Sequence, residues 1–277
     1  MSDFIKFDDN KPDRIQQTFE TLVDEVRSAY LYPPTKKGVC IDIGSNVGAF
    51  TYFVASNDMY EEVYAFEPSQ ETHRTSVAIL GQLGALKKDV EVVNLAVTGK
   101  SGDQFFLHAS PSGRSGDASL IEPEGGSTQK ELVTTISLDD IIEKIGKDRI
   151  DFIKMDCEGA ELDILYHCEN LSKVSIIMAE CHHGCEESVG KLLAEKGFYA
   201  TRLISVSDND VKLPYVIAFN AKEMYLEDIE EYFHVIGDQV KTFGAANPEF
   251  RLKYDEVVQY WTRQHLKEER NNAGEEE

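Results

Sequence analysis

Short apolar runs alternate with segments of helical periodicity along the middle of the 277-residue chain. Five apolar runs are expected to form buried strands: Val39–Ile43, Glu62–Phe66, Val90–Asn94, Ile150–Met155 and Val174–Ala179. Helical patterns lie between or after them, at Ala49–Ala55, Glu71–Leu83, Leu138–Ile145, Ala160–His167 and Glu186–Glu195. This alternation predicts an α/β fold with a doubly wound, mainly parallel sheet that helices cover on both faces.

The alternation is interrupted between Val97 and Leu138, where the sequence has no good helical pattern. Gln104–His108 and Leu132–Ile136 are expected to be strands. Between them, Ala109–Thr128 is rich in Gly, Ser and Pro, which is typical of a mobile loop. We expect this loop to close over a substrate.

Two further strands are expected at Tyr199–Ser205 and Leu213–Phe219, joined by a turn at Ser207–Asp210. Such a hairpin would add an antiparallel edge to the sheet. We therefore expect a core domain at residues 37–222, an N-terminal helical segment at 1–36 and a C-terminal helical appendage at 223–277.

The two flanking segments carry apolar stripes at helical spacing. One stripe comprises Ile15, Phe19, Leu22, Val26 and Tyr30, and two later ones comprise Leu226, Ile229, Phe233 and Ile236, and then Phe250, Tyr254, Val257, Trp261 and Leu266. Stripes of this kind are typical of packing faces. The terminal helices could cover the core domain or form a homodimer interface.

Fifty acidic residues against 28 basic ones give a formal net charge of −22. Such a charge repels phosphate backbones and anionic membranes, so neither nucleic acid nor a membrane is an expected partner. The chain has no apolar run of about 20 residues, the length needed to cross a bilayer. Its polar, acidic N-terminus does not resemble a signal peptide, and we expect a cytoplasmic protein.

Five cysteines are irregularly spaced, as expected for reduced and mostly buried thiols. The run Cys181–Cys185, CHHGC, resembles a fragment of a metal site. A structural zinc site would normally need a second ligand pair at a recognisable spacing, and the sequence has none. We therefore expect no metal at this run.

A candidate nucleotide site begins at Asp42–Gly48, where a strand leads through a glycine-containing turn into a helix. Glycine permits positive φ and close approach of a ligand to the backbone, and Asn46 is one of the few other residue types that tolerate this conformation. Asp42 could orient the loop and receive a ligand ammonium group, directly or through water. Glu67, at the end of the next strand, is placed to accept hydrogen bonds from ribose hydroxyls.

These segments resemble the class I S-adenosylmethionine-dependent methyltransferases, specifically those of the FkbM type. The matching motifs are IDIGSNVGAFT (Ile41–Thr51), YAFEPS (Tyr64–Ser69), VVNLAV (Val92–Val97), SLDD (Ser137–Asp140) and DFIKMDCEGAE (Asp151–Glu161). The resemblance implies a Rossmann-like sheet of seven strands in the order 3-2-1-4-5-7-6, with the last strand antiparallel. It also implies S-adenosylmethionine as the cofactor.

The resemblance implies a role for individual residues. Gly44, Asn46 and Gly48 would line the methionine part of the cofactor, Glu67 would hold the ribose, and Asn94 with Ala96 would border the adenine. Asp156 would lie where cofactor and substrate meet. The full set of expected cofactor-binding residues is Asp42, Gly44, Ser45, Asn46, Gly48, Glu67, Pro68, Asn94, Ala96 and Asp156.

Two clusters at strand ends could serve an acceptor hydroxyl: Asp156, Glu158 and Glu161 form one, and Glu180, His182 and His183 the other. His182 is our candidate general base, with Asp156 orienting the acceptor or the cofactor and Glu158 and Glu180 beside them. His182 could equally satisfy a local hydrogen bond. We expect no resident metal, although two carboxylates and a histidine could also hold a divalent cation.

The resemblance implies O-methylation of a hydroxyl on a small molecule or on a sugar unit of a glycan. Methyltransferases that modify DNA bases typically carry N/D-P-P-Y/F after the fourth strand, whereas this chain has Asp156-Cys157-Glu158-Gly159. Two alternatives are an NAD-dependent oxidoreductase, disfavoured by the spacing of the glycine loop, and a non-catalytic binding module with a methyltransferase-like fold.

Overall fold

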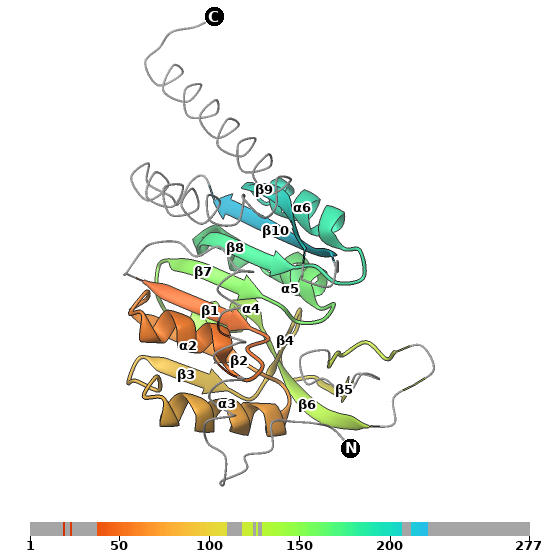
Figure 1. The fold of residues 1–277 in the computed structure, drawn as a ribbon. Helices are drawn as coiled ribbons and strands as arrows, with labels where there is room; N and C mark the ends of the chain where they lie inside the picture. The colour runs from red at the N-terminus through yellow and green to blue at the C-terminus, as the bar shows by residue number, and fades with distance from the viewer. Residues whose placement is uncertain are drawn as a thin grey trace, which may run out of the picture.

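The computed structural model describes residues 19, 23, 38–109, 118–123, 126, 129–206 and 212–220, apart from the side chains of 199, 201–206 and 212–214 (Figure 1). Its strands are β1 (Val39–Ile43), β2 (Glu62–Phe66), β3 (Val90–Val93), β4 (Ala96–Thr98), β5 (Gln104–His108), β6 (Lys130–Ser137), β7 (Ile150–Met155), β8 (Val174–Glu180), β9 (Phe198–Val206) and β10 (Lys212–Asn220). Its helices are α2 (Ala49–Ser56), α3 (Gln70–Gln82), α4 (Leu138–Ile145), α5 (Glu161–His167), the 3₁₀-helix η2 (Asn170–Lys173) and α6 (Glu186–Glu195).

The main sheet contains seven strands in the order β3-β2-β1-β7-β8-β10-β9. The first five are parallel to one another, whereas β10 pairs antiparallel with both β8 and β9. The expected mixed α/β sheet is therefore confirmed, and so is the terminal hairpin, although its turn at Ser207–Asp210 lies outside the described residues. Parallel strands with helical crossovers bring their carboxyl ends to one edge, and this edge positions the site.

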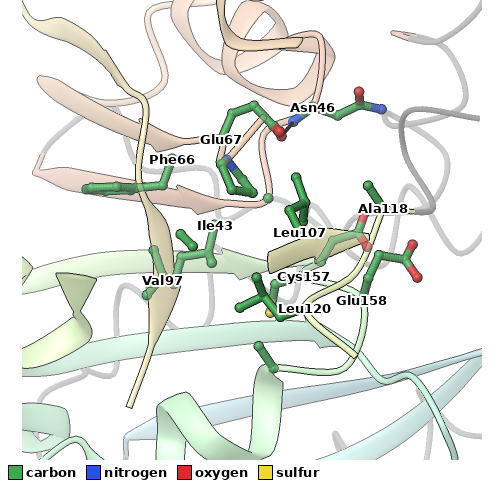
Figure 2. Close-up of a pocket in the computed structure, with 15 residues that line it drawn as sticks. Ile43, Asn46, Phe66, Glu67, Val97, Leu107, Ala118, Leu120, Cys157 and Glu158 are labelled. Atoms are coloured by element: carbon green, nitrogen blue, oxygen red, sulfur yellow. Dashed lines mark hydrogen bonds between the residues drawn. The ribbon is translucent and has the colours of Figure 1, made fainter. Parts of the chain in front are cut away.

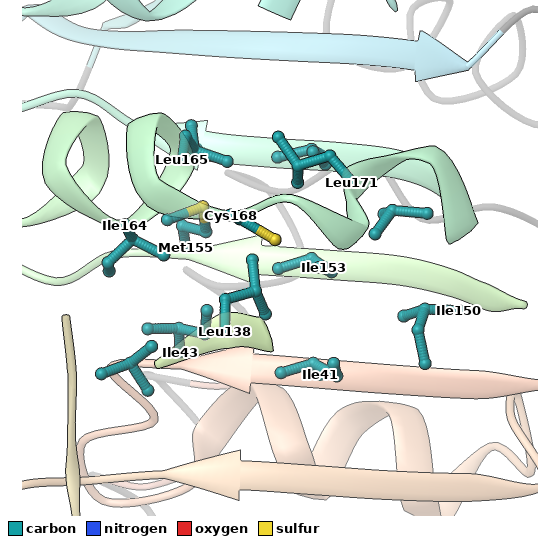
Figure 3. Packing of buried hydrophobic residues seen from close by; sticks show 14 of the residues in the cluster. Ile41, Ile43, Leu138, Ile150, Ile153, Met155, Ile164, Leu165, Cys168 and Leu171 are labelled. Carbon is teal, nitrogen blue, oxygen red and sulfur yellow. The ribbon is translucent and has the colours of Figure 1, made fainter. Parts of the chain in front are cut away.

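Helices cover both faces of the sheet because alternate side chains of each buried strand point in opposite directions. On one face, Ile41, Ile153 and Ile177 belong to a large core cluster with residues of α4, α5 and α6 (Figure 3). On the other face, Phe152 stacks on Phe50 of α2 with the ring centroids 6.2 Å apart. The central strands β1, β7 and β8 therefore consist almost wholly of buried residues, as their apolar runs predicted.

A second, three-stranded sheet has the order β4-β6-β5. The sequence predicted β5 and most of β6 but not β4, which has only three residues and pairs in parallel with the distant end of β6. Ala96, Leu107 and Val133 form its own small core. This sheet lies beside the carboxyl ends of β1 and β2, where it forms one wall of the site described below.

Little of the flanking segments lies within the described residues. Phe19, from the predicted N-terminal stripe, is 1% exposed and packs with Val47, Ala49 and Ile79. The other stripe residues, the C-terminal helices and most of the predicted loop at Ala109–Thr128 lie outside the described residues. In the part of the chain that is described, no helix has both the length and the apolar character to cross a membrane.

Candidate functional site

The turn between β1 and α2 uses three residues with positive φ: Gly44 at 74°, Asn46 at 49° and Gly48 at 85°. The predicted left-handed conformation of Asn46 is thus confirmed. A Cβ atom on Gly44 would lie 1.8 Å from the backbone oxygen of Asp156, so the turn packs directly against the end of β7. Gly48 is the N-cap of α2. Both glycines are required by backbone geometry.

Glu67 fastens this turn to the end of β2. Its carboxylate accepts hydrogen bonds from the backbone N–H of Asn46 at 3.0 Å and of Ser69 at 2.9 Å. Burial raises the pKa of Glu67 to about 7, and these two hydrogen bonds only partly oppose it. The side-chain amide of Asn94 donates to the carbonyl oxygens of Glu67 and Pro68. Glu67 therefore has a structural role in addition to any contact with a ligand.

A pocket opens at the carboxyl ends of β1, β2 and β7, with a volume of about 620 Å³ that includes its opening to solvent (Figure 2). The pocket is lined by Ile43, Gly44, Asn46, Phe66, Glu67, Pro68, Ala96, Val97, Leu107, Ala118, Leu120, Asp156, Cys157, Glu158 and Ala160. Its walls thus combine the polar turn with apolar residues of the small sheet.

The predicted cofactor-binding residues divide into two groups. Six of them line the pocket: Gly44, Asn46, Glu67, Pro68, Ala96 and Asp156. The other four support it from outside: Asp42, Ser45, Gly48 and Asn94. Sequence reasoning missed Leu107 as a lining residue, because it comes from a strand with no nucleotide-binding motif. Ala118 and Leu120 belong to the loop at Ala109–Thr128 that is expected to close over a substrate.

Asp42 does not occupy the position that the sequence suggested. It is 0% exposed, accepts a hydrogen bond from Thr51 at 2.7 Å and pairs with Lys154 at 3.2 Å. A carboxylate buried in this way stabilises the turn from beneath and has no exposed surface for a ligand ammonium group. The prediction that Asp42 contacts a ligand directly is therefore wrong in this structure. Its predicted role in orienting the loop is consistent with these contacts.

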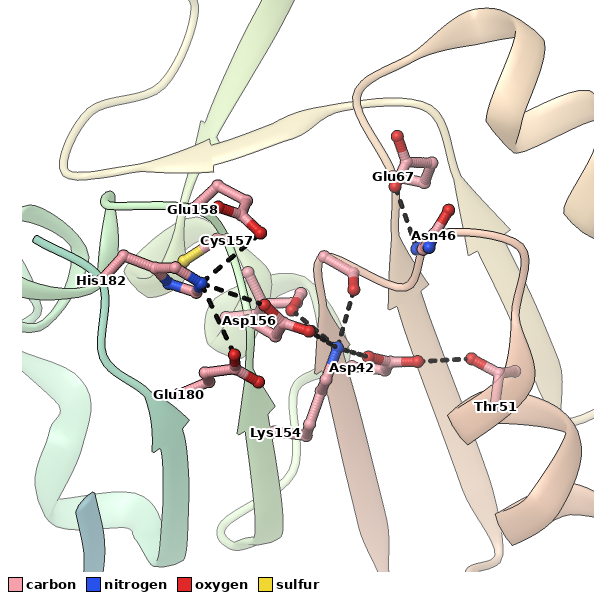
Figure 4. A network of polar contacts seen from close by, with 12 residues as sticks. Asp42, Asn46, Thr51, Glu67, Lys154, Asp156, Cys157, Glu158, Glu180 and His182 are labelled. Atoms are coloured by element: carbon pink, nitrogen blue, oxygen red, sulfur yellow. Dashed lines mark hydrogen bonds and ion pairs between the residues drawn. The ribbon is translucent and has the colours of Figure 1, made fainter. Parts of the chain in front are cut away.

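Lys154 is a buried cation that sequence reasoning missed (Figure 4). Its Nζ lies 2.7 Å from the carbonyl oxygen of Gly44 and 3.7 Å from a carboxylate oxygen of Asp156. Burial lowers the pKa of Lys154, but the charges of Asp42 and Asp156 outweigh this and raise it. The sequence feature that could have revealed this buried cation is a single lysine within the apolar run of β7. Lys154 thus connects the glycine turn to the acidic end of β7.

His182 lies in the middle of the predicted acceptor clusters. Its Nδ1 hydrogen-bonds the carboxylate of Glu161 at 2.8 Å, while Nε2 lies 3.4 Å from Glu158, 3.7 Å from Glu180 and 3.9 Å from Asp156. The structure therefore brings together the four predicted catalytic residues, as Figure 4 shows. Asp156 and Glu158 also line the pocket, so the cluster adjoins it.

The acidic surroundings change the expected chemistry of His182. Burial lowers its pKa, but the hydrogen bond to Glu161 and the charges of Glu158, Glu161 and Asp156 outweigh burial and raise the pKa to about 9. An imidazole with these neighbours holds its proton at neutral pH, which disfavours the predicted role of His182 as a general base. Burial and the charge of Asp156 raise the pKa of Glu180, and Glu180 also accepts a hydrogen bond from Tyr215.

The CHHGC run does not form a metal site among the described residues. Cys181 is buried in the large core cluster, and His183 is an exposed residue in the turn that follows β8. Within the described ranges, the group whose ligand atoms could hold a metal consists of Asp156, Glu158 and His182. The absence of a metal at the cysteine run stays a prediction, and the carboxylate–histidine cluster requires separate consideration.

Comparison with known families identifies the family of this domain. The model of the methyltransferase FkbM domain matches residues 42–238, which is more than half of the chain. The chain belongs to the FkbM methyltransferase family. The matched region begins at Asp42 in β1, just before the glycine turn, and includes the pocket and the acidic cluster. The FkbM-type resemblance of the sequence motifs is therefore confirmed.

Two curated relatives of this FkbM domain are similar over part of their lengths. The AMB antimetabolite synthetase AmbE of Pseudomonas aeruginosa is 27% identical over 65% of this chain and 10% of its own length. The hexuronic acid methyltransferase AglP of Haloferax volcanii is 30% identical over 56% of this chain and 60% of its own length. The chain thus spans less than two thirds of either relative.

Among solved structures, the methyltransferase FkbM of Methylobacillus flagellatus is similar to this FkbM domain with a TM-score of 0.47 and 18% identity. The similarity covers 66% of this chain and 44% of that protein. Membership of the family rests on the match to the family model and does not depend on this structural comparison.

Proposed function

We propose that this FkbM domain transfers a methyl group from S-adenosylmethionine to a hydroxyl of a small molecule or of a sugar unit in a glycan. The observation that carries the proposal is the position of Asp156 and Glu158. Both line the pocket that ends at the glycine turn, and both belong to the cluster around His182. A methyl donor and an acceptor hydroxyl would therefore meet at these residues.

The residues of the pocket fit the cofactor. Glu67 has a carboxylate for the ribose hydroxyls, and the apolar side chains of Phe66, Val97 and Leu107 suit the adenine. Gly44, Asn46 and Asp156 line the pocket at the turn, where the methionine part would bind. When bound, S-adenosylmethionine supplies an electrophilic methyl group on a sulfonium. The chain has to orient the acceptor, exclude water and accept one proton.

The acidic cluster is suited to the acceptor side of this reaction. Asp156 and Glu158 can accept a hydrogen bond from the acceptor hydroxyl, and burial and the charge of Asp156 raise the pKa of Glu180 beside them. His182 keeps these groups in place through its contacts to them. In this proposal the carboxylates take up the hydroxyl proton in place of the protonated imidazole.

The hydroxyl of a uronic acid or a related sugar is the first acceptor to test, because AglP is named as a hexuronic acid methyltransferase. A screen with radiolabelled S-adenosylmethionine over uronic acid glycans, neutral glycans, polyols and phenolics would identify the class. Calorimetry would measure binding of S-adenosylmethionine and of NAD to the same protein. Binding of NAD without binding of S-adenosylmethionine would favour an oxidoreductase and would contradict the proposal.

Replacing Glu67 with glutamine should weaken binding of S-adenosylhomocysteine by about tenfold or more, because charge-assisted hydrogen bonds to the ribose are lost. The wild-type affinity should also depend on pH. Since the pKa of Glu67 is about 7 and its ionised form is the better acceptor, affinity should fall as the pH drops below this value. The fall from about pH 8 to about pH 6 should approach tenfold.

Calorimetric titrations at several pH values would measure both effects. Glu71→Gln is the matched control, because Glu71 is an exposed carboxylate in the first turn of α3. The control should bind like the wild type at each pH. An affinity of the Glu67→Gln variant that equals the wild type would remove Glu67 from the cofactor site.

Replacing Asp156 with asparagine or Glu180 with glutamine should lower kcat/KM for methyl transfer by about 100-fold or more, as is typical when a proton acceptor is lost. His182→Asn should have a similar effect, since the ring contacts all four carboxylates of the cluster. His167→Asn and Glu195→Gln are controls, because both residues are exposed and lie outside the pocket. Unchanged methyl transfer in all three site variants would contradict the assignment.

A further inference from the structure

The ligand-type atoms of Asp156, Glu158 and His182 all lie within 4.8 Å of one another. In an octahedral site with metal–ligand distances of 2.0–2.1 Å, opposite ligands are about 4 Å apart and adjacent ones about 3 Å. The distances from His182 Nε2, 3.4 Å to Glu158 and 3.9 Å to Asp156, lie between these two values. A small contraction of the side chains would bring all three atoms to one ion.

The orientation of His182 is fixed from behind. Glu161 is 0% exposed, and its Oε1 accepts the hydrogen bond from Nδ1 of His182 at 2.8 Å. Since Nδ1 donates to Glu161, Nε2 is directed to the remaining carboxylates. A carboxylate that holds the far nitrogen of a histidine in this way is the usual second layer of a metal site.

Glu161 also provides an observation independent of the three ligand residues. Its second oxygen, Oε2, is buried and accepts no hydrogen bond among the described residues. A fully buried carboxylate is costly unless a positive charge lies close to it. Through Oε1, which also accepts from the backbone N–H of Gly159 at 3.1 Å, Glu161 places a buried negative charge against Nδ1 of His182, and this charge would stabilise a cation bound at Nε2 of the same ring.

We propose that Asp156, Glu158 and His182 bind a divalent metal ion of the Mg²⁺ or Mn²⁺ class. Two carboxylates and one imidazole match the preference of Mn²⁺ for oxygen ligands with nitrogen tolerated. Glu180, whose Oε1 is 3.7 Å from Nε2, lies beside this site and is held by Tyr215. The imidazole coordinates in its neutral form, so binding of the metal releases the proton from Nε2.

The metal would act on the acceptor. Asp156 and Glu158 line the pocket, so an ion on these residues faces the proposed position of the acceptor hydroxyl. Coordination lowers the pKa of a hydroxyl and makes it a better nucleophile near neutral pH. This catalytic consequence rests on the proposed function, whereas the binding of the metal does not.

The test is a titration of the metal-free full chain with Mn²⁺. The concentration of free Mn²⁺ is measured at each step by electron paramagnetic resonance. We expect one strong site with a dissociation constant at or below about 100 µM, with Mg²⁺ as a competitor. We expect Mn²⁺ affinity to fall at least tenfold in each of the variants Asp156→Asn, Glu158→Gln and His182→Asn. Loss of a group that only supports a metal ligand already lowers metal affinity by about 10–100-fold. His167→Asn and Glu195→Gln should bind like the wild type.

The nitrogen ligand has its own spectroscopic signature. Electron spin echo modulation of bound Mn²⁺ should show a coupled ¹⁴N nucleus in the wild type and lose it in His182→Asn. A wild type that binds no Mn²⁺ at about 1 mM, or site variants that bind as well as the wild type, would overturn the proposal. Circular dichroism and S-adenosylhomocysteine binding of each variant would show that it is folded.

The two proposals can fail separately. Mn²⁺ binding is measured without cofactor or acceptor, so a failure to find methyl transfer leaves the metal site standing. Conversely, full methyl transfer in the presence of excess EDTA, with Mn²⁺ binding absent, would overturn the metal site and leave the proposed function intact.

Discussion

Replacing Gly44 with alanine is expected to abolish measurable binding of S-adenosylhomocysteine and, with it, methyl transfer. The new Cβ would lie 1.8 Å from the backbone oxygen of Asp156, and Gly44 has a φ of 74°. Because the obstacle is the backbone of Asp156, directly after β7, no side-chain rotation can relieve the overlap. The turn has to move away from β7, and this movement displaces the residues that line the pocket on both sides.

The matched control is Gly84→Ala. Gly84 has a φ of 70°, close to that of Gly44, but a Cβ there meets no atom within 4 Å. Gly84→Ala therefore carries only the conformational cost of a left-handed alanine, about 1–2 kcal/mol, and should keep its affinity for the cofactor. Urea unfolding and calorimetry of both variants measure the two effects. If Gly44→Ala bound the cofactor as Gly84→Ala does, the close contact with β7 would have no functional meaning.

The sequence predicted the elements whose signal is local. The strands at Val39–Ile43 and Ile150–Met155 are matched to the residue, because a buried strand in a parallel sheet is a continuous apolar run. By contrast, β4 has three residues, and its partner is β6, more than thirty residues further along the chain. A strand this short carries no periodicity, so the second sheet and its wall of the pocket could not be predicted.

The sequence predicted which strand ends form the candidate site. It did not predict in which direction the side chains at these ends point. Asp42 and Glu67 both follow the expected pattern, yet Glu67 lines the pocket and Asp42 points beneath the turn. Asp42 is paired in register with Lys154 of β7, which places both side chains on the same face of the sheet. Which face a residue occupies depends on this register, and the register is set by the neighbouring strand.

The chemistry of His182 depends on its neighbours in the same way. Its position two residues after β8 suggested a base, but Glu158 reaches it from the turn after β7 and Glu161 from the first residue of α5. Glu158 has a φ of 54°, a left-handed conformation that a sequence motif does not reveal. These contacts, and not the residue type, determine the charge of the ring.

Replacing Lys154 with methionine is expected to destabilise the fold by about 3–5 kcal/mol, because it leaves the buried carboxylate of Asp42 without its cation. Lys154 is 3% exposed and Asp42 is 0% exposed. The double variant Asp42→Asn/Lys154→Met removes both charges and should recover a large part of the loss. Urea unfolding of the wild type, both single variants and the double variant measures the coupling. Lys147→Met, which removes an exposed partner of Glu62, should shift the unfolding curve little.

The double variant also separates the two roles of Lys154. Its Nζ donates to the carbonyl of Gly44 at 2.7 Å, and methionine cannot replace this hydrogen bond. If Lys154 serves stability alone, recovery of the fold should restore cofactor affinity. We expect affinity to stay at least about tenfold below the wild type, because a charge-assisted hydrogen bond that positions the turn is still missing. Full recovery of both stability and affinity would show that Lys154 only neutralises Asp42. Recovery of stability alone would show that this buried cation holds the cofactor turn against the acidic end of β7.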